Sequence, residues 1–179
     1  NIGTHNVVYT DIENTDNYDH IYQSDLCGWV GQLGYNKDSI YGANVYTAEG
    51  NETLKAASFY ATGKDSQYEL YVVRQFEDET SLEKMIPVAS GKLGNAGYYT
   101  VDFNQGIEVD AGERYAVVLH IITPGSVHPM AIEYAADEAT ENVDLDDGES
   151  YISANGSKWV SVDTVEKSNL CIKTFSDNR

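Results

Sequence analysis

The sequence predicts an all-β fold, a two-sheet antiparallel β-sandwich of jelly-roll type. About ten short segments alternate apolar and polar residues with the period of two that a half-buried strand requires, and glycine-rich or polar turns separate them. Helical periodicity is almost absent. The chain also holds 14 tyrosines against 4 phenylalanines, an aromatic choice typical of strands and of surfaces that join an apolar ring to a polar tip. Short strands at turn-punctuated intervals are the pattern of a sandwich.

The first 38 residues contain little predicted secondary structure. Residues 5–12 hold one short alternating strand, and no element longer than a few residues is predicted from Glu13 to Asp38. A loop of this length inside a compact domain is usually functional or poorly ordered. This one carries four aromatic side chains, so we expect it to pack on the domain and to be ordered: Tyr18, Tyr22, Trp29 and Tyr35.

The stretch around which the rest of the chain is organised is residues 41–60. It consists of two alternating segments joined by the polar turn from Glu49 to Glu52, so the sequence predicts a central β-hairpin. Residues 68–76 alternate most strongly and predict the clearest single strand. Residues 81–85 follow with at most one helical turn.

Beyond residue 85 the strand pattern continues. Residues 115–122 are nearly continuous in apolar character, as expected for a central strand that is covered on both faces. Asn155 and Gly156 tolerate positive φ and predict a hairpin between the strands that flank them. The remaining strands are predicted at residues 88–93, 98–103, 106–112, 129–134, 150–153, 159–162 and 170–175.

Length and charge bound the class of the protein. At 179 residues the chain is long enough for one domain with a real core and too short for two ordinary domains. Its 29 acidic residues against 11 basic ones give a formal net charge of −18, which argues against nucleic acid and anionic membranes as partners because both would be repelled. No run of residues approaches the apolar length of a transmembrane helix, so we expect no membrane insertion. A neutral partner such as a glycan, cation binding, or a role outside the cell agrees better with this charge.

Nothing in the sequence predicts a catalytic site. Cys27 lies among acidic residues, which raise the pKa of a thiol, whereas a nucleophilic thiolate needs an electropositive setting and an imidazole partner. The four histidines show no metal-ligand spacing, and each is interpreted as a satisfied core or surface imidazole. No Ser-His-Asp pattern, nucleophile elbow or glycine-rich phosphate loop occurs in the sequence. We therefore expect no enzymatic activity in this chain.

The two cysteines, Cys27 and Cys171, leave two interpretations open. They pair in a disulfide if the early segment lies against the last strand, an arrangement that the first and last segments of sandwiches often adopt. Otherwise they are two free thiols that act as small apolar side chains, and this interpretation is favoured.

Two groups of acidic residues are candidates for a structural calcium ion, the one cofactor that the sequence suggests. Hard cations prefer several carboxylate and carbonyl oxygens that converge from loops. Asp16 and Asp19 lie in the long early loop, and Asp144 and Asp146 lie in residues 133–149, which hold eight acids and no base. The alternative is that these residues form the solvated surface of acidic loops.

The early loop also has the residue types of a carbohydrate site. Sugar rings stack their C–H faces on exposed aromatic rings, while carboxylates and amides bond the hydroxyls. We therefore predict ligand-binding residues at Tyr22, Trp29, Tyr35 and Asp25. The alternative is that these aromatic side chains pin the loop to the sheet and touch no ligand.

Six stretches of the chain resemble a known family. They are residues 43–48 (Ala-Asn-Val-Tyr-Thr-Ala), 52–56 (Glu-Thr-Leu-Lys-Ala), 96–102 (Ala-Gly-Tyr-Tyr-Thr-Val-Asp), 111–117 (Ala-Gly-Glu-Arg-Tyr-Ala-Val), 148–153 (Gly-Glu-Ser-Tyr-Ile-Ser) and 169–173 (Asn-Leu-Cys-Ile-Lys). Together they resemble the lectin-like domain that follows the papain-type cysteine peptidase domain in secreted and surface proteins of Firmicutes bacteria. The resemblance covers roughly residues 16–176. These runs are strand and turn signatures, so they bear on the fold more than on a ligand.

The resemblance implies a non-catalytic accessory domain of a secreted or cell-surface papain-like cysteine peptidase, which targets the enzyme to a glycan or a cell-surface protein. The alternative is a structural module that packs on the preceding peptidase domain, stabilises it and binds no carbohydrate. In such a protein residues 1–13 are the last strand of the peptidase domain or a linker, and residues 14–179 are the lectin-like sandwich. The other interpretation makes residues 5–12 the first strand of the sandwich itself.

Overall fold

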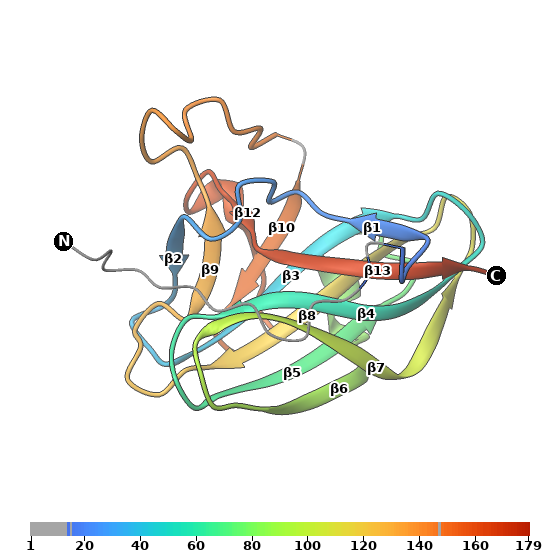
Figure 1. Ribbon diagram of the computed structural model, residues 1–179, viewed down its shortest axis with the longest axis horizontal. Coiled ribbons are helices and arrows are strands. Elements are labelled where there is room, and N and C mark those ends of the chain that lie inside the picture. The colour runs from blue at the N-terminus through green and yellow to red at the C-terminus, as the bar shows by residue number, and fades with distance from the viewer. Residues whose placement is uncertain (1–13, 15, 147) are drawn as a thin grey trace.

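The computed structural model describes residue 14 and residues 16–146 and 148–179, and it confirms the predicted all-β antiparallel sandwich. Two main sheets pack face to face around a shared core, and a small third sheet lies at one end of them (Figure 1). The strand predicted at residues 5–12 and the linker interpretation of residues 1–13 lie outside the described residues.

Thirteen strands and two 3₁₀ turns form in the described part of the chain. The four-stranded sheet has the order β1 (His20–Tyr22), β13 (Ile172–Asn178), β4 (Glu52–Ala61) and β7 (Gly97–Val109). The six-stranded sheet has the order β11 (Val160–Ser161), β10 (Glu149–Ser153), β3 (Ser39–Thr47), β8 (Arg114–Ile122), β5 (Ser66–Val73) and β6 (Ile86–Leu93). The three-stranded sheet has the order β12 (Asn169–Leu170), β9 (Met130–Glu133) and β2 (Gly31–Leu33). The two turns are η1 (Glu79–Glu83) and η2 (Val162–Thr164). In this part of the chain, no helix has the length and apolar character needed to span a membrane.

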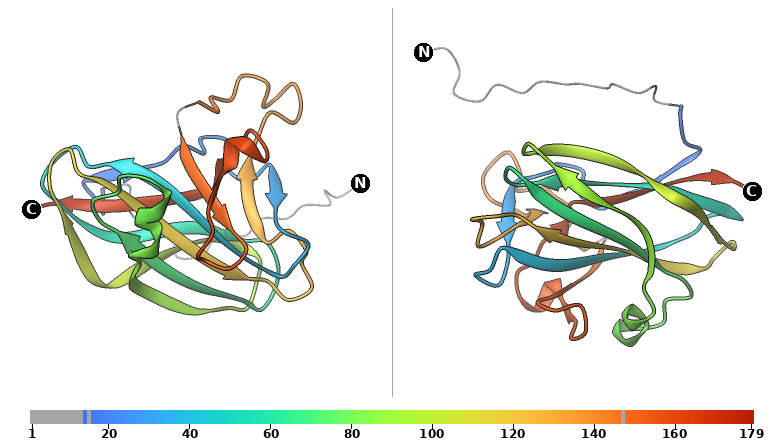
Figure 2. Two further views of the ribbon diagram at one scale, coloured as in Figure 1. Left: turned by 180° about the vertical axis from the view of Figure 1, so that it is seen from behind. Right: turned by 90° about the horizontal axis from the view of Figure 1, so that it is seen from below.

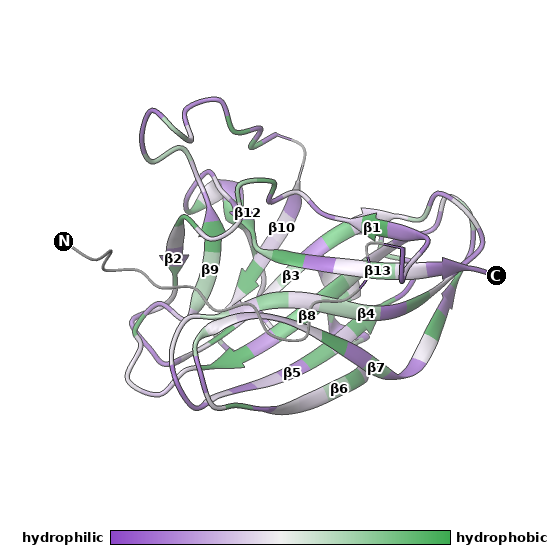
Figure 3. Cartoon of the chain, viewed as in Figure 1, coloured by the Kyte–Doolittle hydropathy of each residue, from purple (hydrophilic) through white to green (hydrophobic). Residues whose placement is uncertain are grey.

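Strand β8 is central to the six-stranded sheet and is covered on both faces, as its apolar sequence predicts. Leu119 and Ile121 face the core between the two main sheets. Ala116 and Val118 face the other side, where Phe76, from the segment between β5 and η1, packs with them. Figure 3 shows apolar residues, in green, interspersed with polar ones along the strands. Burial of a side chain of valine or leucine size stabilises the fold by about 1.5–3 kcal/mol. Strand β8 therefore contributes stability through both of its faces.

The central hairpin predicted at residues 41–60 does not form. Its two strands exist as β3 and β4, but β3 pairs with β8 and β10, whereas β4 pairs with β13 and β7. The chain crosses from one main sheet to the other between Thr47 and Glu52. Alternation of apolar and polar residues reveals that a strand has one buried face, but it does not reveal which strand lies beside it. The prediction was therefore wrong about the pairing and right about the strands.

A buried carboxylate holds this crossing in place. Glu52 is fully buried and accepts hydrogen bonds from the Tyr22 hydroxyl at 2.7 Å, the Gly50 amide at 2.8 Å and the Ser176 hydroxyl at 2.5 Å. The Tyr22 oxygen in turn accepts a hydrogen bond from the Glu49 amide at 2.9 Å. Burial opposes ionisation of Glu52, but the hydrogen bonds outweigh it and lower its pKa below the usual value. One ionised side chain thus joins β1, β13 and the crossing.

Most of the other predicted elements are present with changes at their ends, but the strand predicted at residues 170–175 divides into β12 and β13, which belong to different sheets. The early loop contains two short strands, β1 and β2, that were not predicted. The segments predicted at residues 98–103 and 106–112 form one continuous strand, β7. The helical turn predicted at residues 81–85 is η1, which Asp78 caps at its N-terminus. The hairpin predicted around Asn155 and Gly156 joins β10 to β11.

Removing the Tyr22 hydroxyl tests the network at the crossing. We expect Tyr22→Phe to lower the free energy of unfolding by about 1–3 kcal/mol at neutral pH, because Glu52 stays buried and ionised with one donor fewer. The folded pKa of Glu52 lies below its unfolded value, so the stability that it contributes is present above the unfolded pKa and is lost as the pH falls through the folded pKa. The difference between the two proteins should therefore shrink in acid.

Urea unfolding from neutral to acid pH measures both effects. The matched control is Tyr99→Phe, since the Tyr99 hydroxyl bonds only an exposed backbone carbonyl, that of Asn95. Equal destabilisation of the two variants would contradict the role given to Glu52.

Candidate functional site

The outer face of the six-stranded sheet, on the side away from the core, carries the candidate site. Two segments rise from this side of the molecule, η1 and the loop between β10 and β11 (Figure 2). The segment around η1 packs on one half of the face through Phe76 and Leu82. The other half, where β3 and β5 begin and β8 ends, keeps partly or fully exposed polar side chains.

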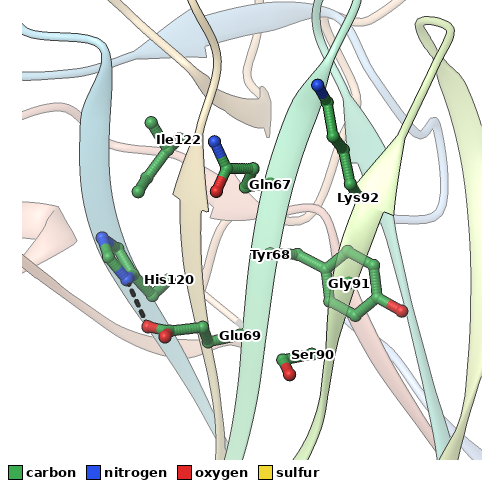
Figure 4. A pocket seen from close by; sticks show the side chains of 8 residues that line it. All are labelled: Gln67, Tyr68, Glu69, Ser90, Gly91, Lys92, His120 and Ile122. Carbon is green, nitrogen blue, oxygen red and sulfur yellow. Dashed lines mark hydrogen bonds and ion pairs between the residues drawn. The ribbon is translucent and has the colours of Figure 1, made fainter.

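A pocket of about 380 Å³ lies on this exposed half (Figure 4). Its lining comes from β5, β6 and β8 and consists of Gln67, Tyr68, Glu69, Ser90, Gly91, Lys92, His120 and Ile122. We call the set of outward side chains on β3, β8, β5 and β6 the His120 face; it consists of Ser39, Tyr41, Gln67, Glu69, Ser90, Lys92, His120 and Ile122.

A chain of hydrogen bonds fixes the centre of the His120 face. The His120 ring lies 2.7 Å from Glu69 Oε2 through Nδ1 and 2.9 Å from the Ser39 hydroxyl through Nε2. Tyr71 donates a second hydrogen bond to the same Glu69 oxygen at 3.0 Å. Tyr41 stacks on His120, with the ring centroids 3.9 Å apart and the planes 2° from parallel. The His120 side chain is 12% exposed and that of Glu69 is 50% exposed, so the imidazole holds the carboxylate where a ligand can reach it.

These contacts also set the charge of Glu69. The hydrogen bond with His120 lowers the pKa of the Glu69 carboxyl, partial burial opposes the change, and the hydrogen bond from Tyr71 adds to the lowering. The net pKa lies below the usual value. Glu69 is therefore an ionised hydrogen-bond acceptor at neutral pH.

Ser39, His120 and Glu69 make the contacts of a serine hydrolase triad, but their surroundings do not suit acyl transfer. That reaction requires N–H donors aimed at the developing oxyanion. The backbone amides of β3 and β8, the strands that carry Ser39 and His120, lie in the plane of the sheet because these strands pair with each other. The Ser39 side chain projects from that plane. The arrangement is suited to binding a polar ligand.

Two of the four residues predicted to bind a ligand are buried. Tyr22 is 9% exposed and its hydroxyl is bound to Glu52. Asp25 is fully buried and pairs with Lys173, whose Nζ lies 3.2 Å from Asp25 Oδ2 and donates to the Asp25 carbonyl at 3.1 Å. Burial raises the pKa of Asp25, and Lys173 opposes the rise. These are the contacts expected from the alternative interpretation, in which the residues attach the early loop to the sandwich.

The two remaining predicted residues differ in exposure. Tyr35 packs partly buried against the core, whereas Trp29 is 38% exposed. The Trp29 ring lies 5.8 Å from that of Tyr60, which lies 4.9 Å from that of Tyr98. Tyr98 is 45% exposed, and its hydroxyl lies 2.5 Å from that of Ser58. We call Trp29, Tyr60 and Tyr98 the aromatic patch. Tyr60 alternates with the core residue Phe59, so the patch lies on the outer side of the four-stranded sheet, away from the His120 face.

Both cysteines are free thiols, Cys27 exposed and Cys171 buried, which excludes a disulfide between them. The Cys27 amide donates to the fully buried carboxylate of Glu133. Desolvation and the charge of Glu133 raise the pKa of the Cys27 thiol, and burial raises the pKa of Cys171. Both thiols therefore stay protonated at neutral pH, which is the opposite of the activation that a nucleophile needs.

The acidic residues predicted as calcium ligands do not converge. Asp19 accepts a hydrogen bond from the amide of Asn178 at 2.8 Å, and Asp146 pairs with Lys167 at 2.8 Å. The carboxylates of Asp16 and Asp144 are exposed. Within the described ranges, no group of three or more histidine, cysteine, aspartate and glutamate side chains is placed to hold a metal ion. Calcium binding stays a prediction.

The sequence did not reveal the His120 face. Each histidine was interpreted as isolated, because the partners of His120 lie 51 and 81 positions away along the chain. One signal was present: Gln67 and Glu69 alternate with apolar residues on a confident strand, and His120 interrupts an apolar one. Only the pairing of β3, β8 and β5 brings these positions together.

Comparison with known proteins gives a family and two similar structures. A family model described as "Lectin like domain" matches residues 21–176. The chain resembles a clostridial cysteine protease, Cwp84, after propeptide cleavage, with a TM-score of 0.75 and 23% identity over 89% of this chain and 40% of that one. It also resembles the crystal structure of the cysteine protease and lectin-like domains of Cwp84, a surface layer associated protein of Clostridium difficile, with a TM-score of 0.64 and 21% identity over 79% of this chain and 33% of that one.

The chain spans between a third and two fifths of the length of the two solved proteins. At such identities the likeness to them shows the fold. No curated protein matches the chain.

The pairing of Lys173 with Asp25 is testable through stability. We expect Lys173→Met to lower the free energy of unfolding by about 3–5 kcal/mol at neutral pH, because it leaves a carboxylate uncompensated in the interior. The folded pKa of Asp25 lies above its unfolded value, so this cost is present at neutral pH and is relieved as the pH falls through the folded pKa.

Chemical unfolding as a function of pH measures this effect. Lys92→Met is the matched control, since the ion pair of Lys92 with Asp65 is exposed and worth less than about 1 kcal/mol. A similar loss in both variants, or a loss that does not change with pH, would argue against the buried pair.

Proposed function

The chain belongs to the lectin-like domain family, whose model matches residues 21–176, and from this premise we propose that it is a non-catalytic accessory domain that binds glycans through the His120 face. The domain would serve an exported papain-like cysteine peptidase by attaching it to a glycan-bearing surface. The single observation that carries the proposal is the pocket on the His120 face, with the ionised Glu69 held in its lining by His120.

The chemistry of the pocket supports a polyhydroxylated ligand. Its volume of about 380 Å³ is within the range of small-molecule sites. Gln67 both donates and accepts hydrogen bonds, Glu69 accepts them and Lys92 donates them, so hydroxyl groups of either orientation find a partner. Ile122 adds an apolar surface for the C–H face of a sugar. All of these side chains stand on paired strands, which fix their positions better than a loop does.

The association with a peptidase is supported by the similar structures. Both contain a cysteine protease, and one is described as the protease and lectin-like domains of a surface layer associated protein. A net charge of −18 is compatible with a role outside the cell beside neutral surface polymers. We therefore propose that the domain belongs to a secreted or surface-attached protein.

A second candidate function is a structural one, and the aromatic patch favours it. Trp29 and Tyr98 are exposed large side chains, and the segment leading to Trp29 also exposes Leu26 at 72% and Ile21 at 53%. The rings of the patch pack against one another at interplanar angles of 55°, which presents an irregular apolar surface and no flat platform for a sugar. Such a surface suits docking against another protein domain, here the peptidase.

Blocking the pocket tests glycan binding. We expect the domain to bind at least one glycan class on an array of bacterial and host polysaccharides, and Ser90→Trp to weaken that binding by about tenfold or more because the indole fills the pocket. Gln105→Trp is the matched control, because Gln105 is an exposed residue on β7, in the other main sheet and seven positions from Tyr98. Isothermal titration with the glycan that binds on the array measures the affinity of both variants. Loss of binding in Trp29→Ala together with full binding in Ser90→Trp would move the site to the early loop.

Docking on the peptidase is tested in the parent protein that carries both domains. We expect Leu26→Asp combined with Tyr98→Ala to lower the midpoint of thermal unfolding of the peptidase domain and to speed proteolysis between the domains, because a charge and a truncation disrupt an apolar contact. Ser90→Trp, on the opposite sheet, should leave both readouts unchanged. An unchanged midpoint and cleavage rate in the double variant would speak against the structural role.

A further inference from the structure

Two rows of side chains cross the six-stranded sheet at right angles to its strands. Residues two positions apart on a strand share a face, so both rows stand on the exposed side. Four strands at a spacing of about 4.8 Å make each row about 14 Å long. In strand order from β3 through β8 and β5 to β6, the first row is Tyr41, His120, Glu69 and Ser90, and the second is Ser39, Ile122, Gln67 and Lys92.

The rows are bounded at one end and open at the other. Trp159 lies edge-on to Tyr41, with the ring centroids 6.3 Å apart and the planes at 82°. Gly156 packs so closely on the same ring that a Cβ there would lie 3.1 Å from it. The loop between β10 and β11 therefore forms a wall beside Tyr41. At the other end β6 is the edge of the sheet, and its residues Ser90 and Gly91 are small and exposed.

Hydrogen-bonding and apolar groups are interspersed along this surface. The carboxylate of Glu69 and the amide of Gln67 stand two positions apart on β5, a spacing that suits neighbouring hydroxyls of one sugar ring. Ile122 lies beside Gln67 in the same row and offers an apolar contact to a C–H face. Polar groups continue past β5 to Ser90, so a ligand that fills the pocket extends across the strands.

Charge selects against acidic ligands. A uronic acid or a phosphate in the pocket would lie beside the half-exposed carboxylate of Glu69. The ammonium of Lys92 in the lining lies 3.4 Å from the carboxylate of Asp65, which offsets part of its positive charge. The net charge of −18 adds a long-range repulsion of the same sign. A neutral chain meets none of these penalties.

From these features, and resting on the glycan-binding function proposed above, we infer that the His120 face holds a linear, uncharged oligosaccharide of about three rings that lies across the strands. Glu69 is the specificity-determining residue that accepts hydrogen bonds from sugar hydroxyls. His120 is its positioning residue, because it is nearly buried and bonds Glu69 through one ring nitrogen and Ser39 through the other.

Titration with defined oligosaccharides tests the inference. The neutral probes are oligomers of glucose, mannose, galactose and N-acetylglucosamine with one to five rings, and the acidic probes are galacturonic acid oligomers of the same lengths. We expect the affinity for the preferred neutral series to rise by about tenfold or more from one ring to three and then to level off. We expect the acidic series to bind at least about tenfold more weakly.

The Glu69→Gln variant distinguishes a role of Glu69 in ligand binding from a role in folding. It should weaken neutral binding by about tenfold and reduce the discrimination against the acidic series, while the melting temperature stays unchanged. Gln105→Trp should change none of these readouts. If Glu69→Gln fails to fold, Ser39→Ala serves instead: it removes the hydrogen bond to His120 Nε2 and should lower the affinity about threefold to tenfold.

The possible outcomes distinguish the inference from the function on which it rests. Failure to bind any glycan class on the array removes the proposed function. Three results keep that function and overturn the inference: a preference for the acidic series, an affinity that does not grow beyond one ring, or normal binding by Glu69→Gln while Ser90→Trp abolishes binding.

Discussion

The register of β8 with its two neighbours, β3 and β5, is the constraint on which the rest of this structure depends. Leu119 and Ile121 point into the core, and this fixes His120, between them, on the opposite side of the sheet. Glu69 is directly opposite His120 on one neighbour, and Ser39 is within hydrogen-bond distance on the other. A slip of one residue would turn His120 into the core and break both contacts. The hydrophobic burial that stabilises the sandwich therefore also sets the geometry of the His120 face.

Buried carboxylates make the second set of long-range connections. Among the described residues, Asp25, Glu52 and Glu133 are fully buried in a chain that carries a net charge of −18. A carboxylate in the interior is costly unless donors satisfy it. The partners come from distant parts of the sequence: the Lys173 ammonium forms an ion pair with Asp25, the Tyr22 hydroxyl donates to Glu52, and a backbone amide of the early loop donates to Glu133. Each acid thus ties the early loop to a particular place on the sandwich, and other placements would leave a charge unpaired.

Residue alternation and composition predicted some features of the fold and could not predict others. Alternation and composition report local burial, so they predicted nearly all of the longer strands and the double coverage of β8. They carry no information about pairing, and for this reason β3 and β4 were predicted as a hairpin although they belong to different sheets. The early loop was correctly expected to pack, but its aromatic and acidic residues could not be sorted into structural and exposed ones. Tyr22 and Trp29 look equivalent in sequence, but the pairing of β1 with β13 places Tyr22 in the core beside Glu52, whereas Trp29 stays at the surface.

The separation of the two exposed surfaces has a consequence for how such a domain can work. The His120 face and the aromatic patch stand on different main sheets with the hydrophobic core between them. Sites that share no side chains and lie on opposite faces of a rigid core behave nearly independently, so an occupant of one surface costs the other little binding energy. The two surfaces also differ in chemistry. The His120 face is polar and charged, and strand register fixes its side chains, whereas the aromatic patch is apolar and irregular. In the proposed role of a tether between an enzyme and a polymer, this division would let the face that meets the enzyme stay occupied while the face that meets the polymer exchanges its ligand. The two candidate functions are therefore compatible in one molecule, with one assigned to each sheet.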